Sequence, residues 1–261
     1  MAGNSSSPGV SVTARALSLL TAFDETHRRL GLSEMARRAD LPLGTAHRLV
    51  GELVAFGALS RSPSGDYVVG RRLWDIGLLA PVQTGLREAA SPYLHDLYGA
   101  TAATVHLAVR DGLEVLYVDR LRGSSSVPVV STVGSRLPLH ATGVGKVLLA
   151  HAGPEVEAAA LALLEPVTPY TVTQPGTLRR QLSRARREGW AATAEEMSLG
   201  ACSVAVPVRQ RGEVVAALGL VVASLRTDRP RLVAALEVAA RGIERAVGRL
   251  PAVVPPEVRS T

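Results

Sequence analysis

The chain has 261 residues, of which 47% are hydrophobic and 20% are charged, and its formal net charge is +6. This length fits one large domain or two of ordinary size, and the hydrophobic content excludes an intrinsically disordered chain. Cys202 is the only cysteine, so no disulfide can form within the chain, and we expect the reducing cytoplasm as its location. The longest apolar run, residues 214–225, is too short to span a bilayer, so it predicts a buried strand and no membrane partner.

Positive charge is denser toward the beginning of the chain. Residues 1–72 contain nine arginines against six acidic residues, whereas the rest of the chain contains 20 basic and 17 acidic residues. A basic balance favours polyanions as partners, although an arginine-rich composition also fits a GC-rich genome. Residues 1–10 are small and polar and lack a basic region followed by an apolar one, so they predict a flexible tail rather than a signal peptide. Residues 251–261 predict a second flexible tail.

The first part of the chain has the pattern of three short helices followed by a hairpin. A first helix is expected over 12–23, and a second follows Ser33, a candidate N-cap, and ends before a proline. A third helix is predicted by an apolar stripe with helical spacing, formed by Ala46, Leu49, Val50, Leu53 and Val54. Two short extended pieces, 58–61 and 66–69, follow around a Ser-Pro-Ser-Gly turn. This order is typical of a winged helix-turn-helix domain, which we assign to residues 11–72.

The polar face of the third helix carries candidates for DNA recognition. In a helix-turn-helix domain the recognition helix lies in the major groove, with its N-terminal residues against base edges. Thr45, His47 and Arg48 occupy that end. Arg48 can bind guanine O6 and N7 as a fork, and Arg61 beside the hairpin tip could contact a phosphate. Ser33 is the remaining residue that we predict to contact DNA. The alternative is that an amphipathic helix only exposes polar residues to solvent, so the interpretation depends on the whole order of helices and hairpin.

The remaining chain is expected to form a linker helix and an α+β domain. The linker is assigned to 73–90, with Pro81 and Pro92 expected to kink or divide the helical stretch and a domain boundary near 80–85. Over 91–250, strands and helices follow one another without regular alternation, which predicts an α+β fold around an antiparallel sheet. The expected strands are a hairpin around Asp111 and Gly112 and the segments 127–133, 190–193, 203–209 and 214–222. The expected helices are 142–151, 154–164, 177–188 and 231–249.

The chain contains five long motifs, which are SVTARALSLLTAF, GLSEMARRADLPLGTAHRLVGELVAFGALS, YVVGRRLWDIG, RLPLHATGVGKVLLA and RREGWAATAEEMSLGACSVAVPV. In this order they resemble the IclR family of bacterial transcription regulators, over about residues 11–248. The resemblance implies a winged-helix DNA-binding domain, a linker helix and a C-terminal effector-binding domain of GAF-like α+β fold. It also implies homodimers or tetramers that bind pseudo-palindromic operators in double-stranded DNA and respond to a small metabolite, often an organic or aromatic acid. Leu43 and Gly44 stand where the family often has a polar pair, which puts DNA contacts at these two positions in doubt.

The resemblance places the effector between the PLHATGVGK segment and the last strands of the sheet. Gly143 and Val144 match backbone positions at a helix start whose N–H groups could bind a carboxylate, because a helix N-terminus has unpaired donors and a partial positive charge. The alternative is that Gly143 and Gly145 only permit a tight turn into the helix. The pocket walls are expected to be formed by Val129, Leu137, Thr193, Ser203, Gly219 and Val221.

Several of these wall positions are less polar than in the family's binders of small acids. Thr193 stands where an Asp is common, Ser203 stands where a Cys is common, and Gly219 and Val221 replace serines. This composition predicts a roomier pocket and a larger or more apolar effector than a two- or three-carbon acid, such as an aromatic acid. By strand alternation, Cys202 is expected to face away from Ser203 and to fill the core.

Charged and polar residues near the predicted pocket have two possible roles. Arg136 and His140 could neutralise an anionic ligand, or they could be a surface arginine and a buried, hydrogen-bonded histidine. Glu195 and Glu196 match an acidic pair of the family, for which we expect a structural role at a turn or a subunit contact.

Enzyme chemistry has little support in the sequence. The six histidines lack metal-ligand spacing, and the chain has no G-x-S-x-G elbow, no P-loop and no dinucleotide-binding glycine fingerprint. We therefore expect a regulator with no metal, no cofactor and no catalytic residues. Two alternatives remain, a C-terminal domain that is a ligand-free protein-interaction module and, more remotely, an enzyme that processes small acids.

Overall fold

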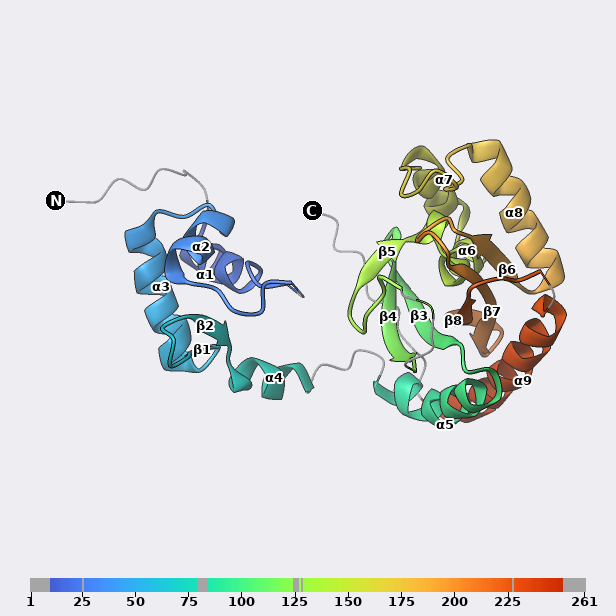
Figure 1. The fold of residues 1–261 in the computed structure, drawn as a ribbon, viewed down its shortest axis with the longest axis horizontal. Helices are drawn as coiled ribbons and strands as arrows, with labels where there is room; N and C mark the ends of the chain where they lie inside the picture. Colours follow the sequence, from blue (N-terminus) through green and yellow to red (C-terminus); the bar gives the residue numbers. More distant parts are fainter. Residues whose placement is uncertain are drawn as a thin grey trace. The chain divides into compact units, whose positions relative to one another are not determined.

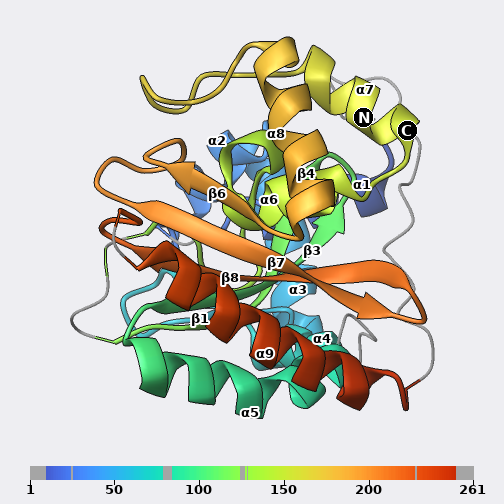
Figure 2. The same cartoon turned by 90° about the vertical axis from the view of Figure 1, so that its right-hand side faces the viewer.

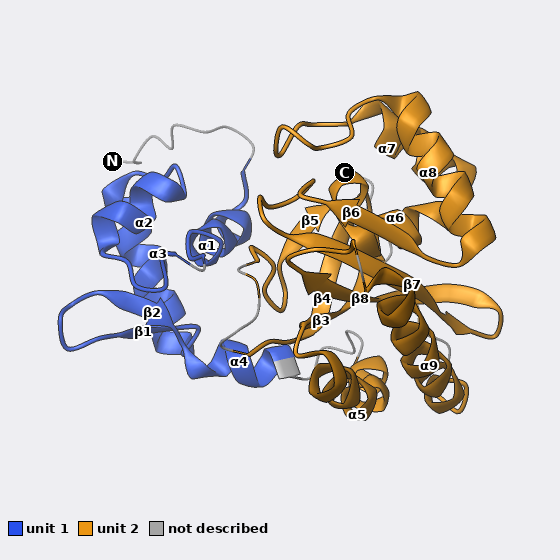
Figure 3. Cartoon of the chain, turned by 45° about the vertical axis from the view of Figure 1, so that its right-hand side comes forward, with its two compact units in different colours: residues 1–81 blue, residues 82–261 orange. Residues whose placement is uncertain are grey.

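The computed structural model describes residues 10–24, 26–78, 84–123, 127, 129–226 and 228–250. The predicted tails over 1–10 and 251–261 lie outside these residues, apart from Val10. The chain divides into two compact units, residues 1–81 and residues 82–261 (Figure 3). In the described part of the chain, no helix combines the length and the apolar character that crossing a membrane requires.

The N-terminal unit begins with three helices that are followed by an antiparallel hairpin (Figure 1). These elements are α1 (Val12–Leu20), α2 (Leu32–Arg38), α3 (Leu43–Phe56), β1 (Leu59–Arg61) and β2 (Tyr67–Val69). In the hairpin, Leu59 lies opposite Val69. α1 ends before the predicted boundary at residue 23, because the chain turns at Thr21. The order of the elements confirms the predicted winged helix-turn-helix fold.

The apolar stripe predicted on α3 packs in the core of this unit. Ala46, Leu49 and Val50 are buried, and Leu53 and Val54 are partly buried against the same cluster. The cluster also takes in residues from α1, α2 and β1, among them Leu19, Met35 and Leu59. The helical period of the sequence therefore predicted both the helix and its buried face.

The start of α2 differs from the prediction. Its N-cap is Gly31, so Ser33 lies in the first turn of the helix and not at the cap. Leu30, just before the cap, exchanges two backbone hydrogen bonds of 2.8 and 3.1 Å with Tyr67 of β2. This pairing holds the chain extended up to the helix, which then begins two residues earlier than it would with Ser33 as its N-cap.

The linker helix predicted over 73–90, which Pro81 was expected to kink or divide, corresponds to two helices in the described residues. They are α4 (Arg71–Leu78) and α5 (Thr84–Thr101). Leu86 and Ala90 of α5 are buried in the core of the C-terminal unit, so this stretch of the predicted linker is part of that unit. α5 continues through Pro92, which does not divide it, and Pro81 lies outside the described residues.

The C-terminal unit is built on a six-stranded antiparallel sheet with the strand order β5-β4-β3-β8-β7-β6. The strands are β3 (Thr104–Asp111), β4 (Glu114–Leu121), β5 (Arg136–Pro138), β6 (Ala191–Ala194), β7 (Cys202–Gln210) and β8 (Glu213–Val222). Besides α5, the described helices of this unit are the short η1 (Leu139–Ala141), α6 (Gly143–Ala150), α7 (Pro154–Ala162), α8 (Pro175–Glu188) and α9 (Arg229–Val247). These elements confirm the predicted α+β fold around an antiparallel sheet.

Helices cover both faces of this sheet (Figure 2). α5 and α9 lie side by side on one face, and α6, α7 and α8 cover the other. Because side chains alternate along a strand, β3 sends Val105 and Leu107 into the core with α5 and α9, whereas Ala108 packs on the α6 side. Each strand in the middle of the sheet therefore contacts two separate layers of helices.

The predicted strand over 127–133 is absent from the described residues of that segment. The chain instead makes a turn in which the Ser135 N–H donates to the Thr132 carbonyl at 3.1 Å and Gly134 takes a left-handed φ of 88°. Two further backbone hydrogen bonds, of 2.8 and 3.1 Å, tie this turn to Tyr117 on β4. The β-branched residues of this segment favoured the prediction of a strand, but the turn limits pairing with β4 to the short β5. Strand β5 was not predicted from the sequence.

Two glycines of the N-terminal unit provide a matched test of how closely the backbone packs within that unit. A Cβ atom at Gly70 would overlap the Gly57 carbonyl, whereas a Cβ at Gly51, on the exposed side of α3, would meet nothing within 4 Å. We expect Gly70→Ala to destabilise the unit by about 2 kcal/mol or more and Gly51→Ala to stabilise it by about 0.5–1 kcal/mol. Hydrogen exchange of the α3 amides measures both changes, and wild-type protection in Gly70→Ala would contradict the close approach.

Candidate functional site

A cavity in the C-terminal unit lies between the start of α6, the sheet and the coil segments 129–131 and 197–201. It holds about 480 Å³ of empty space, part of which is open to solvent. The eight residues predicted to contact an effector all line it, namely Val129, Leu137, Gly143, Val144, Thr193, Ser203, Gly219 and Val221. The structure thus brings together residues that are up to 92 positions apart in the sequence.

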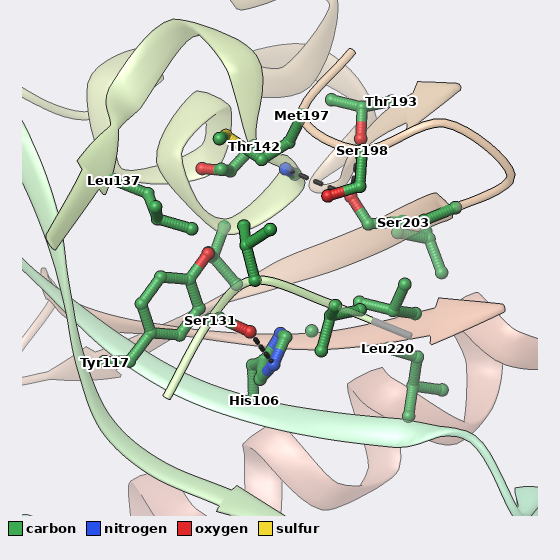
Figure 4. Close-up of a pocket in the computed structure, with 18 residues that line it drawn as sticks. His106, Tyr117, Ser131, Leu137, Thr142, Thr193, Met197, Ser198, Ser203 and Leu220 are labelled. Carbon is green, nitrogen blue, oxygen red and sulfur yellow. Dashed lines mark hydrogen bonds between the residues drawn. The ribbon is translucent and has the colours of Figure 1, made fainter. Parts of the chain in front are cut away.

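The start of α6 forms one polar end of the cavity. Thr142 caps the helix, with its Oγ1 accepting a hydrogen bond from the Gly145 N–H at 3.1 Å. The Gly143 N–H donates to Ser203 Oγ at 3.1 Å, and Ser203 Oγ lies 2.6 Å from Thr193 Oγ1 (Figure 4). The Val144 N–H has no acceptor among the described residues. A helix N-terminus with an unused donor and two hydroxyl groups suits a carboxylate.

The two glycines at this helix start also have a packing role. A Cβ atom at Gly143 would lie 2.6 Å from Ser203 Oγ, and one at Gly145 would overlap the Leu139 carbonyl. Gly145 is therefore required by the tight turn, as the structural alternative predicted. Gly143 is required by the approach of the helix to β7, and this same approach brings its N–H to the cavity.

The opposite end of the cavity carries a polar group that the sequence did not predict. His106 of β3 is buried, and its Nε2 lies 2.8 Å from Ser131 Oγ (Figure 4). Tyr117 of β4 packs edge-on against the imidazole, with ring centroids 4.8 Å apart. Burial, together with the nearby charge of Arg120, lowers the pKa of His106 to about 3. His106 is therefore a neutral hydrogen-bonding group at physiological pH.

No Asp, Glu, Lys or Arg lines the cavity in the described residues. Its titratable side chains are His106 and Tyr117, and burial raises the pKa of Tyr117 above its usual range. Both are uncharged near pH 7. An anionic ligand would therefore be held by hydrogen bonds and the helix N-terminus rather than by a countercharge.

A buried ion pair lies beside the cavity. Lys146 of α6 is 1% exposed, and its Nζ lies 2.6 and 2.8 Å from the two carboxylate oxygens of Glu196 and 2.8 Å from Gln181 Oε1. Burial lowers the pKa of Lys146, and the Glu196 carboxylate offsets part of this effect. Glu196 directly precedes Met197 and Ser198, which line the cavity. The ion pair therefore anchors one wall of the cavity to α6, which agrees with the structural role expected for Glu196.

Three other expectations for this region receive an answer. Arg136 pairs with Asp111 at 2.7 Å, and His140 is buried with its Nε2 2.9 Å from the Glu165 carbonyl oxygen. Neither lines the cavity, which matches the alternative of a surface arginine and a buried histidine. The expectation that Cys202 fills the core is wrong, because this residue is half-buried at the start of β7 and belongs to none of the buried clusters.

In the N-terminal unit, the predicted DNA-contacting residues lie mainly on the surface. Ser33, His47, Arg48 and Arg61 are exposed, and Thr45 is half-buried. Arg61 is partly engaged within the hairpin, since its Nε donates to the Gly65 carbonyl at 3.2 Å and its guanidinium lies over the Tyr67 ring.

Arg48 differs from several other arginines of this unit. Arg37 pairs with Glu34, Arg38 pairs with Asp24, and Arg71 pairs with an acidic residue one turn along its helix. The Arg48 side chain has no hydrogen bond or ion pair within the described residues. Its guanidinium is therefore available to an external partner.

The described residues contain no group of three or more His, Cys, Asp or Glu side chains that could hold a metal ion.

Comparisons with known proteins cover both units. The protein-family model of the IclR helix-turn-helix domain matches residues 12–63. The family model of the bacterial transcriptional regulator IclR C-terminal domain matches residues 80–245. The chain is 33% identical to the HTH-type transcriptional regulator XynR of Escherichia coli K12 over 92% of its own length and 98% of that protein. It is 34% identical to the glycerol operon regulatory protein of Streptomyces coelicolor, over 90% of this chain and 95% of the relative.

A solved structure is similar over nearly the same length. It is an IclR homolog from Microbacterium hydrocarbonoxydans in complex with 4-hydroxybenzoate, with a TM-score of 0.87 and 38% identity, and the match covers 91% of this chain and 99% of that one.

The buried His106 makes the stability of the C-terminal unit sensitive to acid. Its pKa is about 3 in the folded chain and near 6.5 when exposed, so the unfolded state binds the proton first and stability falls as the pH drops below about 6.5. Each pH unit between these values costs about 1.4 kcal/mol. We expect the wild-type protein to lose more unfolding free energy between pH 7 and pH 5 than His106→Gln, measured by urea unfolding followed by circular dichroism. An equal loss in both proteins would contradict the low pKa.

Proposed function

The chain belongs to the IclR family of bacterial transcriptional regulators, and we propose that its N-terminal unit binds an operator whose affinity is controlled by an aromatic acid bound in the C-terminal cavity. The observation that carries the second half of this proposal is the single cavity that contains all eight predicted effector-contacting residues. The first half rests on Arg48 near the start of the recognition helix α3, which is exposed and has no ion pair among the described residues.

The DNA contact follows from the geometry of α3. Its buried stripe faces the core, so His47 and Arg48 near its N-terminal end face outward. In a winged helix-turn-helix these positions meet base edges in the major groove, and Arg61 of the hairpin meets the phosphate backbone. We propose a homodimer, or a tetramer built from two such dimers, whose recognition helices bind pseudo-palindromic half-sites about 34–36 Å apart.

The effector follows from the shape and chemistry of the cavity. Its walls are mostly apolar, and one end offers N–H and hydroxyl groups to a carboxylate, a combination typical of small-molecule sites. The similar IclR homolog was solved with 4-hydroxybenzoate, a molecule of this chemical type. An open cavity disfavours a ligand-free interaction module, and the curated relatives are named as regulators rather than enzymes.

Strand β3 offers a route from the effector to the rest of the chain. His106 faces the cavity, whereas its neighbours Val105 and Leu107 pack in the core that contains α5. α5 is the helix of the C-terminal unit that comes first in the chain after the N-terminal unit. A small shift of β3 on binding would therefore reach α5, and a coupling of about 1–3 kcal/mol is enough for regulation.

The central experiment selects operator fragments from genomic DNA with the purified full-length protein and titrates them with and without 4-hydroxybenzoate. We expect retention of specific fragments and a changed affinity when the acid is present. If no fragment is retained at low salt, with or without the acid, the DNA-binding half of the proposal is wrong.

A first variant tests base recognition by α3. Arg48→Ala should weaken binding to the selected operator by about 1–3 kcal/mol and relax the base preference at one position, because it removes a fork-shaped donor. Fluorescence anisotropy on the operator and its single-base variants measures both effects. Arg179→Ala, which removes an exposed arginine from α8, is the control for loss of charge and should leave the base preference unchanged.

A second variant tests the cavity. Val129 lines it from an irregular segment, so the larger side chain of Val129→Phe fills part of the cavity without distorting a helix or strand. We expect its affinity for 4-hydroxybenzoate, measured by calorimetry, to fall at least tenfold, or by about 1.4 kcal/mol. Val133→Phe places the same ring at an exposed position of the same segment that does not line the cavity, and it should bind like the wild type. Equal losses in both variants would mean that the segment, and not the cavity, was disturbed.

A further inference from the structure

The cavity has a second polar end whose chemistry differs from that of the α6 end. His106 Nε2 and Ser131 Oγ lie 2.8 Å apart there, and both residues are buried. A serine hydroxyl has one donor and two acceptor sites, and a neutral imidazole has one donor and one acceptor. The single hydrogen bond between them therefore leaves capacity for another partner at this end.

A further hydroxyl lies on the same face of β3 as His106. Thr104 is two residues before His106, and its strand partner Val221 lines the cavity, as does Gly219, the partner of His106. Thr104 Oγ1 is buried and has no hydrogen-bond partner among the described residues. Thr104 is not among the residues that line the cavity, so the polar contacts at this end are His106 and Ser131.

The two polar ends differ in the charge that they can stabilise. The α6 end combines backbone N–H donors with the partial positive charge of a helix N-terminus, which favours a carboxylate. Burial keeps His106 neutral, and no cationic side chain lines the cavity in the described residues. A second carboxylate at the floor would lose its hydration without gaining a countercharge. A neutral group that can donate and accept hydrogen bonds meets no such penalty.

We propose that the effector is an aromatic monocarboxylic acid that carries a hydroxyl group, with its carboxylate at the start of α6 and its hydroxyl on His106 and Ser131. This inference rests on the proposed function, because it assigns the orientation and the second substituent of the ligand in the same cavity. The apolar walls between the two ends, including Val144 and Leu220, suit the faces of the ring.

The hydroxyl contact also explains how the ligand would be sensed. Ser131 belongs to the coil segment that closes the cavity, and its backbone carbonyl accepts a hydrogen bond from Arg120 of β4. A ligand hydroxyl on Ser131 and His106 therefore bridges this segment to β3. A ring without the hydroxyl fills the same space but leaves the bridge unmade.

The test compares three acids on the full-length protein by calorimetry at pH 7.5, namely 4-hydroxybenzoate, benzoate and terephthalate. They share the ring and one carboxylate and differ only in the opposite substituent, which is a hydroxyl, a hydrogen or a second carboxylate. We expect 4-hydroxybenzoate to bind at least about tenfold more tightly than benzoate, because a site built to hydrogen-bond a hydroxyl discriminates against its absence. Terephthalate is expected to bind more weakly than benzoate.

Two serine variants assign the preference to the floor of the cavity. Ser131→Ala should bring the affinities for 4-hydroxybenzoate and benzoate to within about threefold of each other, mainly by weakening 4-hydroxybenzoate. Ser135→Ala removes a hydroxyl from the same coil segment. Among the described residues this hydroxyl bonds to Thr132 and does not line the cavity, so the variant should keep the wild-type preference.

The outcomes separate this inference from the function on which it rests. Binding of none of the three acids would overturn the proposed aromatic effector itself. Equal affinities for benzoate and 4-hydroxybenzoate in the wild type, or tighter binding of terephthalate, would leave an aromatic effector in place and overturn the hydroxyl contact. A loss of preference in Ser135→Ala equal to that in Ser131→Ala would also overturn it, because the effect would then come from the segment and not from the contact.

Discussion

The close approach of α6 to strands β7 and β8 is the constraint on which the cavity depends. A Cβ atom at Gly219 would lie 2.7 Å from Val144 Cγ1, and one at Gly143 would crowd Ser203 Oγ. Glycine at these two positions lets the first turn of the helix rest on the strands. The same contact turns the N-terminal amides of α6 toward the hollow beside it, so packing and binding chemistry have a common origin. The buried pair of Lys146 and Glu196 then anchors the wall formed by Met197 and Ser198 to the same helix.

The described residues that line the cavity carry no formal charge near pH 7. Its polar groups are backbone amides, hydroxyls and a neutral imidazole, and each has at least one internal partner or lies at the open space. In a low-dielectric site such groups can recognise an anion without the desolvation cost of burying a cation. This arrangement favours selection by the position of hydrogen-bonding groups over selection by charge alone.

Sequence patterns predicted the elements with strong local signals. The stripe on α3 and the Asp-Gly hairpin between β3 and β4 depend on residues that are neighbours in the chain, and both were found as expected. The walls of the cavity came from the resemblance to a family, because no spacing rule joins Val129 to Val221. The predicted element boundaries were wrong where a residue distant in the sequence determines them. An example is the start of α2, where pairing with Tyr67 holds the preceding chain extended. The strand predicted over 127–133 was wrong because the chain makes a local turn there instead of pairing as a strand.

The missed site residues share one property, which is that their partners are far away in the sequence. His106 meets Ser131 across 25 positions, and Lys146 meets Glu196 across 50. A histidine in an alternating strand gives no sign of whether it faces water or a closed cavity. A lysine in an apolar helix start could have been noticed, since full burial of lysine is rare without a partner.

Lys146 is also the only lysine in the chain, and it is almost completely shielded from solvent. In the folded C-terminal unit, reagents and enzymes that modify lysine amines have no accessible side chain to attack in the whole sequence. Acylation of Lys146 therefore requires the wall around Glu196 to open. The rate at which Lys146 is acylated therefore reports how readily that wall opens, and measuring it needs no engineered label.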